Sequence, residues 1–455
     1  MKNLINLWKN SKLEEKVLWL YIVLVPFTGV SHLYIGMKKV GYADFVFAGL
    51  FLIFLIKYLS KKAKLPGNPM TFSFILMFSL FSLSLFNSVN LFDSFVEIAG
   101  LIYLISLFAL VINIVSTSQS LRYFLNTHLF ISTIISLAGL FFFCSALVTG
   151  NIKNNPFLAY TAMESMAHLF PRIKMTFETS NMLLTYLHVS LIVGIVLFLW
   201  EKRPRIKVFV LFSIAVILIA AFFTGSRRFT GVLLSLFLVL HWFGRGRVVP
   251  MLKYVFFAGF TFFVIASIIT SIWVIFPFNI TKDEVTKNIA LKVNDAYSLH
   301  FIQPVTSVNM FKKHPIIGAG FGTYNKNFKD NVDWEWFRSS FGFDAYPKYK
   351  RLVENRAVVF DPHSVFLGTL AETGLAGFLG LMYFFFKYIM LLLKRFRASD
   401  RYSTAHIISG SILAGFIGFL LNGIITDILS MRHFWIMISI GMIGFLYREG
   451  DRVRC

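Results

Sequence analysis

Residues 181–223 read NMLLTYLHVSLIVGIVLFLW, then EKRPRIK, then VFVLFSIAVILIAAFF. A helix that crosses a bilayer needs roughly 20 mainly apolar residues, and both outer parts of this stretch approach that length. The short link between them carries Lys202, Arg203, Arg205 and Lys207. Two apolar runs joined by a basic link predict two transmembrane helices with a cytoplasmic loop between them.

The whole composition agrees with this stretch. The chain has 455 residues, of which 57% are apolar and 15% charged, and its mean hydropathy is +0.70. A soluble domain carries about 25% charged residues, so a soluble globular enzyme and a disordered chain are both excluded. The net charge of +22 sits in clusters between apolar runs, which predicts membrane lipids and no nucleic acid as partners. Cys144 and Cys455 cannot form a disulfide framework or a thiolate metal site.

We therefore predict an all-α polytopic membrane protein with about twelve transmembrane helices. The first apolar run follows charged residues and lacks a small-residue cleavage site, so it predicts a retained helix and not a signal peptide. The predicted spans lie near residues 17–34, 43–60, 70–87, 93–115, 128–149, 181–200, 206–223, 228–243, 252–277, 363–393, 404–422 and 431–447.

Lysine and arginine in alternate loops orient these spans, because basic loops stay cytoplasmic. Both termini are predicted to be cytoplasmic. Residues 1–277 would hold the first nine helices, with a periplasmic loop near 150–180. Residues 278–362 would form one large periplasmic loop between helices 9 and 10, and 363–455 would hold the last three helices.

Four basic residues lie on predicted outer connections, where topology does not require them. Arg172 and Lys174 belong to PRIKMTFETSN, and Arg227 and Arg228 to TGSRRFTG. The guanidinium group donates two parallel hydrogen bonds and keeps its charge, which suits phosphate. These residues predict a site for a lipid-linked phosphate or diphosphate. The alternative is that they extend to outer-leaflet headgroups.

The stretch VVFDPHSVFLGTLAETGLAGFLG, residues 358–380, begins the tenth predicted helix. Asp361 suits the N-cap region of this helix, and Pro362 suits its first turn. His363 can take or give a proton near neutral pH, although a histidine in this place can also be purely structural. Three glycines at positions 374, 377 and 380 permit close helix contact.

These motifs resemble those of the O-antigen ligases, a family that also includes O-antigen polymerases and protein O-oligosaccharyltransferases. His363-Ser364, nine residues, Gly374, two residues and Gly377 are similar to the ligase signature. HPIIGAGFGTY (314–324), TGSR (224–227) and RIKMTFETSN (172–181) are similar to three further family elements. Met175 stands where the family often has glycine, and Arg228 where a small residue is usual.

The resemblance implies a glycosyltransferase of the membrane-embedded GT-C type, facing the periplasm in the bacterial inner membrane. It would be metal-independent and without a cofactor. The donor would be a glycan on undecaprenyl diphosphate, and the family's essential residues map to Arg172, Arg227 and His363. We expect Lys174, Asn181, Arg228 and Arg356 to contact the substrate. No Asp-x-Asp carboxylate cluster lies on the predicted outer side, so arginines would replace a metal.

Three functions remain open at this stage. An inverting O-antigen ligase would transfer the glycan to the lipid A-core oligosaccharide, and the His363 signature favours it. A polymerase of the same superfamily would add the glycan to another lipid-linked repeat. A flippase or transporter is the third, but transporters often show internal symmetry and midplane charges, which this chain does not clearly show. The glycines at 318, 320 and 322 indicate a tight turn or a phosphate cradle; without a preceding strand we favour the turn.

Overall fold

The computed structural model describes most of the chain. Two end segments and the predicted outer-loop stretches 160–170, 276–301 and 342–359 lie outside the described residues, and so does the predicted site residue Arg356. The described residues are 12–30, 33–35, 38–61, 67–150, 155–159, 171–244, 248–275, 302–341 and 360–446.

Most of these residues are helical, because an α-helix satisfies its backbone N–H and C=O groups with its own hydrogen bonds where no water can reach them. One helix lies at each predicted span: α2 (Leu13–Leu24), α3 (Tyr42–Leu59), α4 (Thr71–Ser82), α5 (Leu91–Ile114), α6 (Ser118–Thr149), α8 (Ser180–Trp200), α9 (Pro204–Phe223), α10 (Phe229–Phe243), α11 (Val248–Ile275), α16 (Val365–Ala398), α17 (Thr404–Gly423) and α18 (Arg432–Leu446).

Seven of the described helices are long and apolar enough to cross a membrane: α3, α5, α6, α8, α9, α16 and α17. Four further apolar segments are shorter, including α10 and α18. The prediction of an all-α polytopic membrane protein is confirmed at this level. The count of twelve spans, the domain limits and the side on which each loop lies stay predictions.

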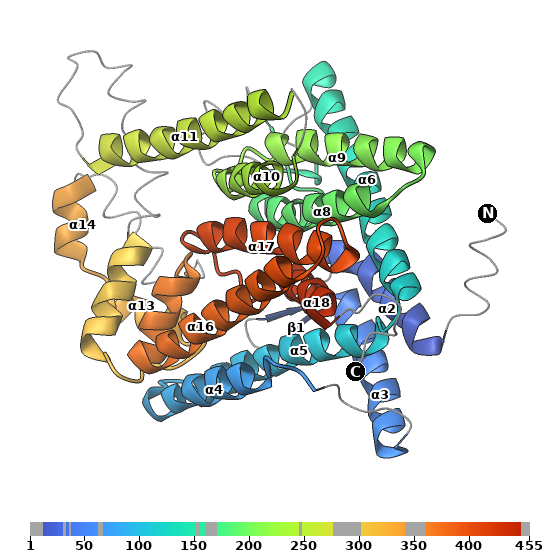
Figure 1. Ribbon diagram of the computed structural model, residues 1–455. Coiled ribbons are helices and arrows are strands. Elements are labelled where there is room, and N and C mark those ends of the chain that lie inside the picture. The colour runs from blue at the N-terminus through green and yellow to red at the C-terminus, as the bar shows by residue number, and fades with distance from the viewer. Residues whose placement is uncertain are drawn as a thin grey trace, which may run out of the picture.

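Helix α8 lies near the middle of the bundle, and almost every residue from Leu183 to Leu197 is buried. Figure 1 shows α8, α16 and α17 between α9–α11 on one side and α4–α5 on the other. Polar side chains join α8 to its neighbours: His188 Nε2 lies 2.8 Å from Ser235 Oγ of α10. Such interhelical hydrogen bonds stabilise helix association where lipid gives no hydrophobic driving force.

The first predicted span, 17–34, is wrong at its outer end. Helix α2 ends at Leu24 and continues only as the short 3-10 helix η1 (Val25–Phe27). A two-stranded hairpin follows, with β1 (Leu33–Ile35) antiparallel to β2 (Lys38–Val40). Between η1 and this hairpin, Gly29 N donates to Thr176 O at 2.8 Å. This bond holds the chain against the segment that follows β4 (Arg172–Ile173). A Cβ on Gly29 would lie 2.6 Å from that oxygen, so only glycine permits this approach.

A second short hairpin pairs β3 (Leu158–Ala159) with β4 (Arg172–Ile173). Met175 follows β4 with φ +51°, a left-handed backbone that favours glycine. Its side chain is buried and packs against Gly139 of α6. The left-handed backbone agrees with the glycine that is frequent at this position in the family element that residues 172–181 resemble. In this chain, burial of the methionine side chain offsets the backbone strain.

Helix α16 is broken at Gly374, which has φ +64° and ψ −166°. Four backbone hydrogen bonds join the break to residues 315–320: Ala319 N to Ala371 O (3.0 Å), Gly320 N to Glu372 O (2.9 Å), Leu375 N to Pro315 O (2.9 Å) and Ala376 N to Ile316 O (3.0 Å). The glycine-rich segment therefore satisfies backbone groups that the break leaves unpaired. These bonds favour the tight-turn interpretation of that segment over a phosphate cradle.

Gly374→Ala is expected to destabilise the protein strongly. Its backbone conformation is essentially restricted to glycine and costs other residues about 1–3 kcal/mol. An added Cβ would also lie 2.5 Å from the backbone of Gly318 and Ile316. Thermal unfolding of the purified protein in detergent measures the effect. Gly100→Ala in α5 is the matched control, because nothing lies within 4 Å of its added Cβ. Equal midpoints for the two variants would contradict this account.

Candidate functional site

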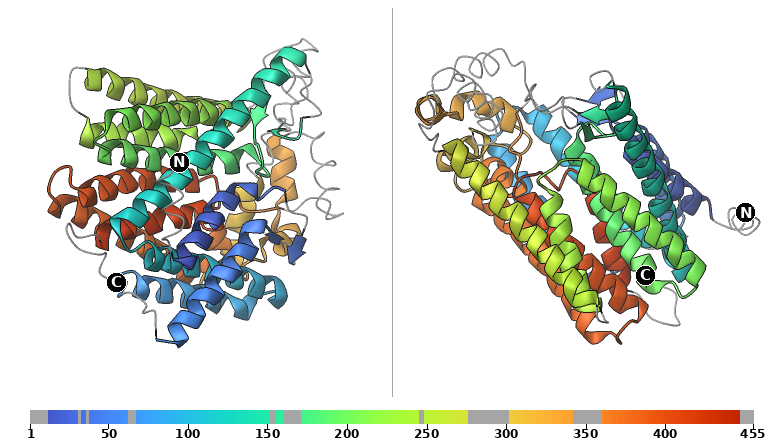
Figure 2. Two further views of the ribbon diagram at one scale, coloured as in Figure 1. Left: turned by 90° about the vertical axis from the view of Figure 1, so that its right-hand side faces the viewer. Right: turned by 90° about the horizontal axis from the view of Figure 1, so that it is seen from above.

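Four chain segments far apart in sequence meet at one end of the long helices. They are β4, the loop 224–228 between α9 and α10, the segment 360–364 before α16, and the connection 424–431 between α17 and α18. The short helices α13 (Tyr324–Asn331) and α14 (Trp334–Phe341) lie at this same end (Figures 1 and 2). We call these four segments the candidate site.

Arg172 is held in place by two hydrogen bonds. Its Nε donates to Thr224 O at 2.7 Å, and its Nη2 donates to Asn181 Oδ1 at 3.2 Å. The Asn181 oxygen also accepts from Ser226 Oγ at 2.7 Å. Asn181 therefore orients Arg172 and the 224–228 loop together. Its predicted contact with the substrate stays a prediction.

Arg227 lies close enough to Arg172 for the two charges to repel. Burial lowers the pKa of Arg172, and the charge of Arg227 lowers it further. Gly225, with φ +59°, lets the Arg172 side chain pack against its Cα, since an added Cβ would lie 3.2 Å from Arg172 Cγ. Two guanidinium groups held together in a partly dry place form a good position for an anion.

Arg228 points to another segment. Its guanidinium is buried, and its Nη2 donates to Ile425 O at 2.9 Å. Burial lowers its pKa to about 10, while the charge of Asp361 opposes this shift. Arg228 therefore ties the 224–228 loop to the α17–α18 connection and also lies within electrostatic range of Asp361.

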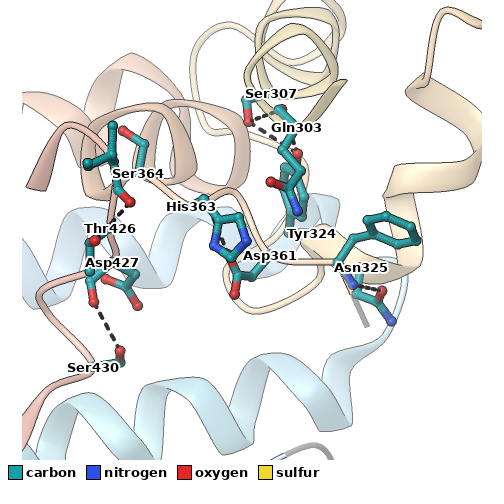
Figure 3. A network of polar contacts seen from close by, with 12 residues as sticks. Gln303, Ser307, Tyr324, Asn325, Asp361, His363, Ser364, Thr426, Asp427 and Ser430 are labelled. Atoms are coloured by element: carbon teal, nitrogen blue, oxygen red, sulfur yellow. Dashed lines mark hydrogen bonds and ion pairs between the residues drawn. The ribbon is translucent and has the colours of Figure 1, made fainter. Parts of the chain in front are cut away.

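His363 and Asp361 form a pair on the segment before α16. His363 Nδ1 lies 2.5 Å from Asp361 Oδ1, and the backbone N of His363 donates to the same oxygen at 2.8 Å. His363 has φ +45°, an uncommon conformation that often marks a functional residue. Figure 3 shows the pair between Tyr324 and Asn325 on one side and Thr426 and Asp427 on the other.

The neighbours of this pair fix the segment at both ends. Phe360 N donates to Asn325 Oδ1 at 2.8 Å, and Val365 N donates to Thr426 O at 3.0 Å. The N-cap of α16 is Ser364, whose Oγ accepts from Leu367 N at 3.3 Å. The predictions that Asp361 caps the helix and that Pro362 lies in its first turn are therefore wrong, because Ser364 is the N-cap and the helix begins at Val365. The carboxylate of Asp361 pairs with His363 instead.

The other predicted site residues are less informative. Lys174 is half-buried, and its backbone N donates to Phe157 O at 3.1 Å; no described contact places its amine. Arg356 lies outside the described residues. The sequence analysis did not identify Asp361 as the partner of His363. The Asp-Pro-His spacing was the available signal, because it places the carboxylate two residues before the histidine. Within the described ranges, no group of three or more His, Cys, Asp or Glu residues could hold a metal ion.

The fold and the candidate site define a multi-pass helical membrane protein with arginines and an Asp–His pair gathered at one end. Residues 212–382 match the family model for O-antigen ligase. This part of the chain is therefore similar to the O-antigen ligase family, and the match supports the resemblance seen in the sequence motifs. It includes Arg227 and His363 and leaves Arg172 outside. No curated protein sequence matches the chain.

Proposed function

We propose that the protein is an O-antigen ligase that transfers a glycan from undecaprenyl diphosphate to the lipid A-core oligosaccharide. It would act in the bacterial inner membrane with its site facing the periplasm. The supporting observation is a group of interacting charges: Arg227 lowers the pKa of Arg172, and Arg228 lies within electrostatic range of Arg172 and of Asp361, which pairs with His363. This group would provide an anion position and a proton acceptor.

The arginines suit the leaving group. When the bond between the sugar carbon and the diphosphate oxygen breaks, negative charge grows on the diphosphate. Arg172 is already fixed by Thr224 O and Asn181 Oδ1, so little reorganisation is needed when this charge develops. Two fixed positive charges can replace the divalent metal that many glycosyltransferases use. Substrate contacts by Lys174, Asn181, Arg228 and Arg356 belong to this proposal.

The histidine suits the acceptor. A hydroxyl of the acceptor sugar attacks the anomeric carbon from the side opposite the diphosphate, and its proton passes to Nε2 of His363. The new glycosidic bond forms as the diphosphate leaves, so configuration at that carbon inverts. His363 keeps 43% of its side chain exposed, so an acceptor can reach it.

The runner-up is a polymerase of the same superfamily, which needs the same leaving-group and acceptor chemistry. The His-Ser-x9-Gly-x-x-Gly pattern favours the ligase. A transporter of lipid-linked sugars would need the arginines but not a histidine held by a carboxylate.

Deletion of the gene should separate these functions. For a ligase, we expect lipopolysaccharide with bare core and long glycan chains retained on undecaprenyl diphosphate. A core that carries a single repeat would instead indicate a polymerase. Gel analysis of lipopolysaccharide and mass spectrometry of the lipid-linked pool measure the two outcomes. Complementation with Asp330→Asn, which removes an exposed carboxylate that belongs to none of the four segments of the candidate site, should restore the wild-type pattern.

A further inference from the structure

A single carboxylate oxygen binds His363 twice. Asp361 Oδ1 lies 2.5 Å from His363 Nδ1 and accepts the His363 backbone N–H at 2.8 Å. The same oxygen thus fixes both the left-handed backbone of His363 and the direction of its imidazole ring. A residue with φ +45° needs such support to keep one conformation.

This contact also selects the tautomer of the imidazole. A carboxylate can only accept hydrogen bonds, so Nδ1 must carry the proton. The lone pair of the neutral ring is then on Nε2, the nitrogen on the other side of the ring from Asp361. A general base needs its lone pair on the nitrogen that meets the acceptor hydroxyl.

The surroundings keep Asp361 charged. Burial raises the pKa of the Asp361 carboxyl, but the hydrogen bonds and charge of His363, together with the charge of Arg228, outweigh burial and lower it. Among the described residues, Tyr324 of α13 also faces the Asp361 carboxylate. Asp427 of the α17–α18 connection lies nearby in Figure 3. An ionised Asp361 stabilises the imidazolium that forms when His363 takes a proton.

We infer that Asp361 is a positioning residue of the transfer reaction, which holds His363 with its proton on Nδ1 and its lone pair on Nε2. This inference rests on the proposed function of His363 as general base. Asp361 would act through His363, and its charge would also interact with that of Arg228.

Asp361→Asn tests this inference in the purified full-length protein. The Asn oxygen can still accept the His363 backbone N–H, so the turn is preserved. The neutral amide no longer stabilises the imidazolium that forms when His363 takes the proton. We expect kcat to fall on the order of 10-fold to 100-fold, with binding of undecaprenyl diphosphate unchanged.

The double variant Asp361→Asn/His363→Ala separates positioning from a structural role. If Asp361 acts through His363, the double variant should be no slower than His363→Ala alone. Equal losses in both backgrounds, an unfolded Asp361→Asn protein, or a wild-type kcat in Asp361→Asn would each overturn the inference. Full activity of His363→Ala would instead refute the proposed general base. Asp330→Asn is the matched control, as it removes an exposed carboxylate outside the candidate site.

Discussion

His363→Ala is expected to abolish glycan transfer while binding of undecaprenyl diphosphate stays near the wild-type level. The substitution removes the group that takes the acceptor proton in the transition state. Loss of one general base lowers the rate typically 10²–10⁴-fold. The arginines that would bind the diphosphate lie on other segments, namely β4 and the 224–228 loop, so the donor position should persist. Single-turnover rates and donor binding on the same preparation measure both quantities.

His314→Ala is the matched control for this variant. His314 is exposed and precedes the glycine-rich segment, and its backbone N–H bonds to Met310 O at 3.1 Å. Because that bond survives the substitution, transfer should remain at the wild-type rate. Weak donor binding in His363→Ala with an unchanged rate at saturation would refute the general-base role.

The positions of the helices could be predicted because apolar length largely decides them, although α6 begins at Ser118, well before the predicted span 128–149. Residues 181–200 and 206–223 contain enough apolar side chains for a span, and α8 and α9 occupy them. The end of α2 could not be predicted. It depends on contact between Gly29 and the backbone at Thr176, which lies far along the chain. The break in α16 depends in the same way on the paired segment 315–320.

The same difference between local sequence and distant contacts applies to the candidate site. Arg172 and Arg227 could be singled out from residue type and predicted depth, since arginine at an outer connection is costly and needs a reason, and His363 from its resemblance to the ligase signature. Their partners could not be chosen. Asn181 reaches Arg172 only because β4 lies against the start of α8. Asp361 was interpreted as part of a helix terminus, because local spacing does not show which side chain a carboxylate will bind.

Arg172→Ala and Arg227→Ala should each weaken both donor binding and turnover. The diphosphate is charged in the ground state and gains charge as the sugar leaves, so each arginine acts at both stages. We expect kcat/KM to fall on the order of 10²–10³-fold, the usual effect of removing one preorganised donor. Lysine should rescue only partly. A single ammonium cannot reproduce the planar fork with which Arg172 bonds Thr224 O and Asn181 Oδ1 at once.

Two comparisons show whether a loss of activity in the arginine variants comes from the diphosphate position. Arg205→Ala removes an exposed arginine from the first turn of α9, at the opposite end of that helix from the 224–228 loop, and should leave transfer unchanged. Arg228 is unsuitable as a neutral control, because its guanidinium holds Ile425 O at 2.9 Å and its loss would also loosen the α17–α18 connection. If Arg227→Ala folds normally and binds undecaprenyl diphosphate as tightly as the wild type, the arginines do not hold the diphosphate. The transporter interpretation would then be favoured only if His363→Ala also retained the wild-type lipopolysaccharide pattern.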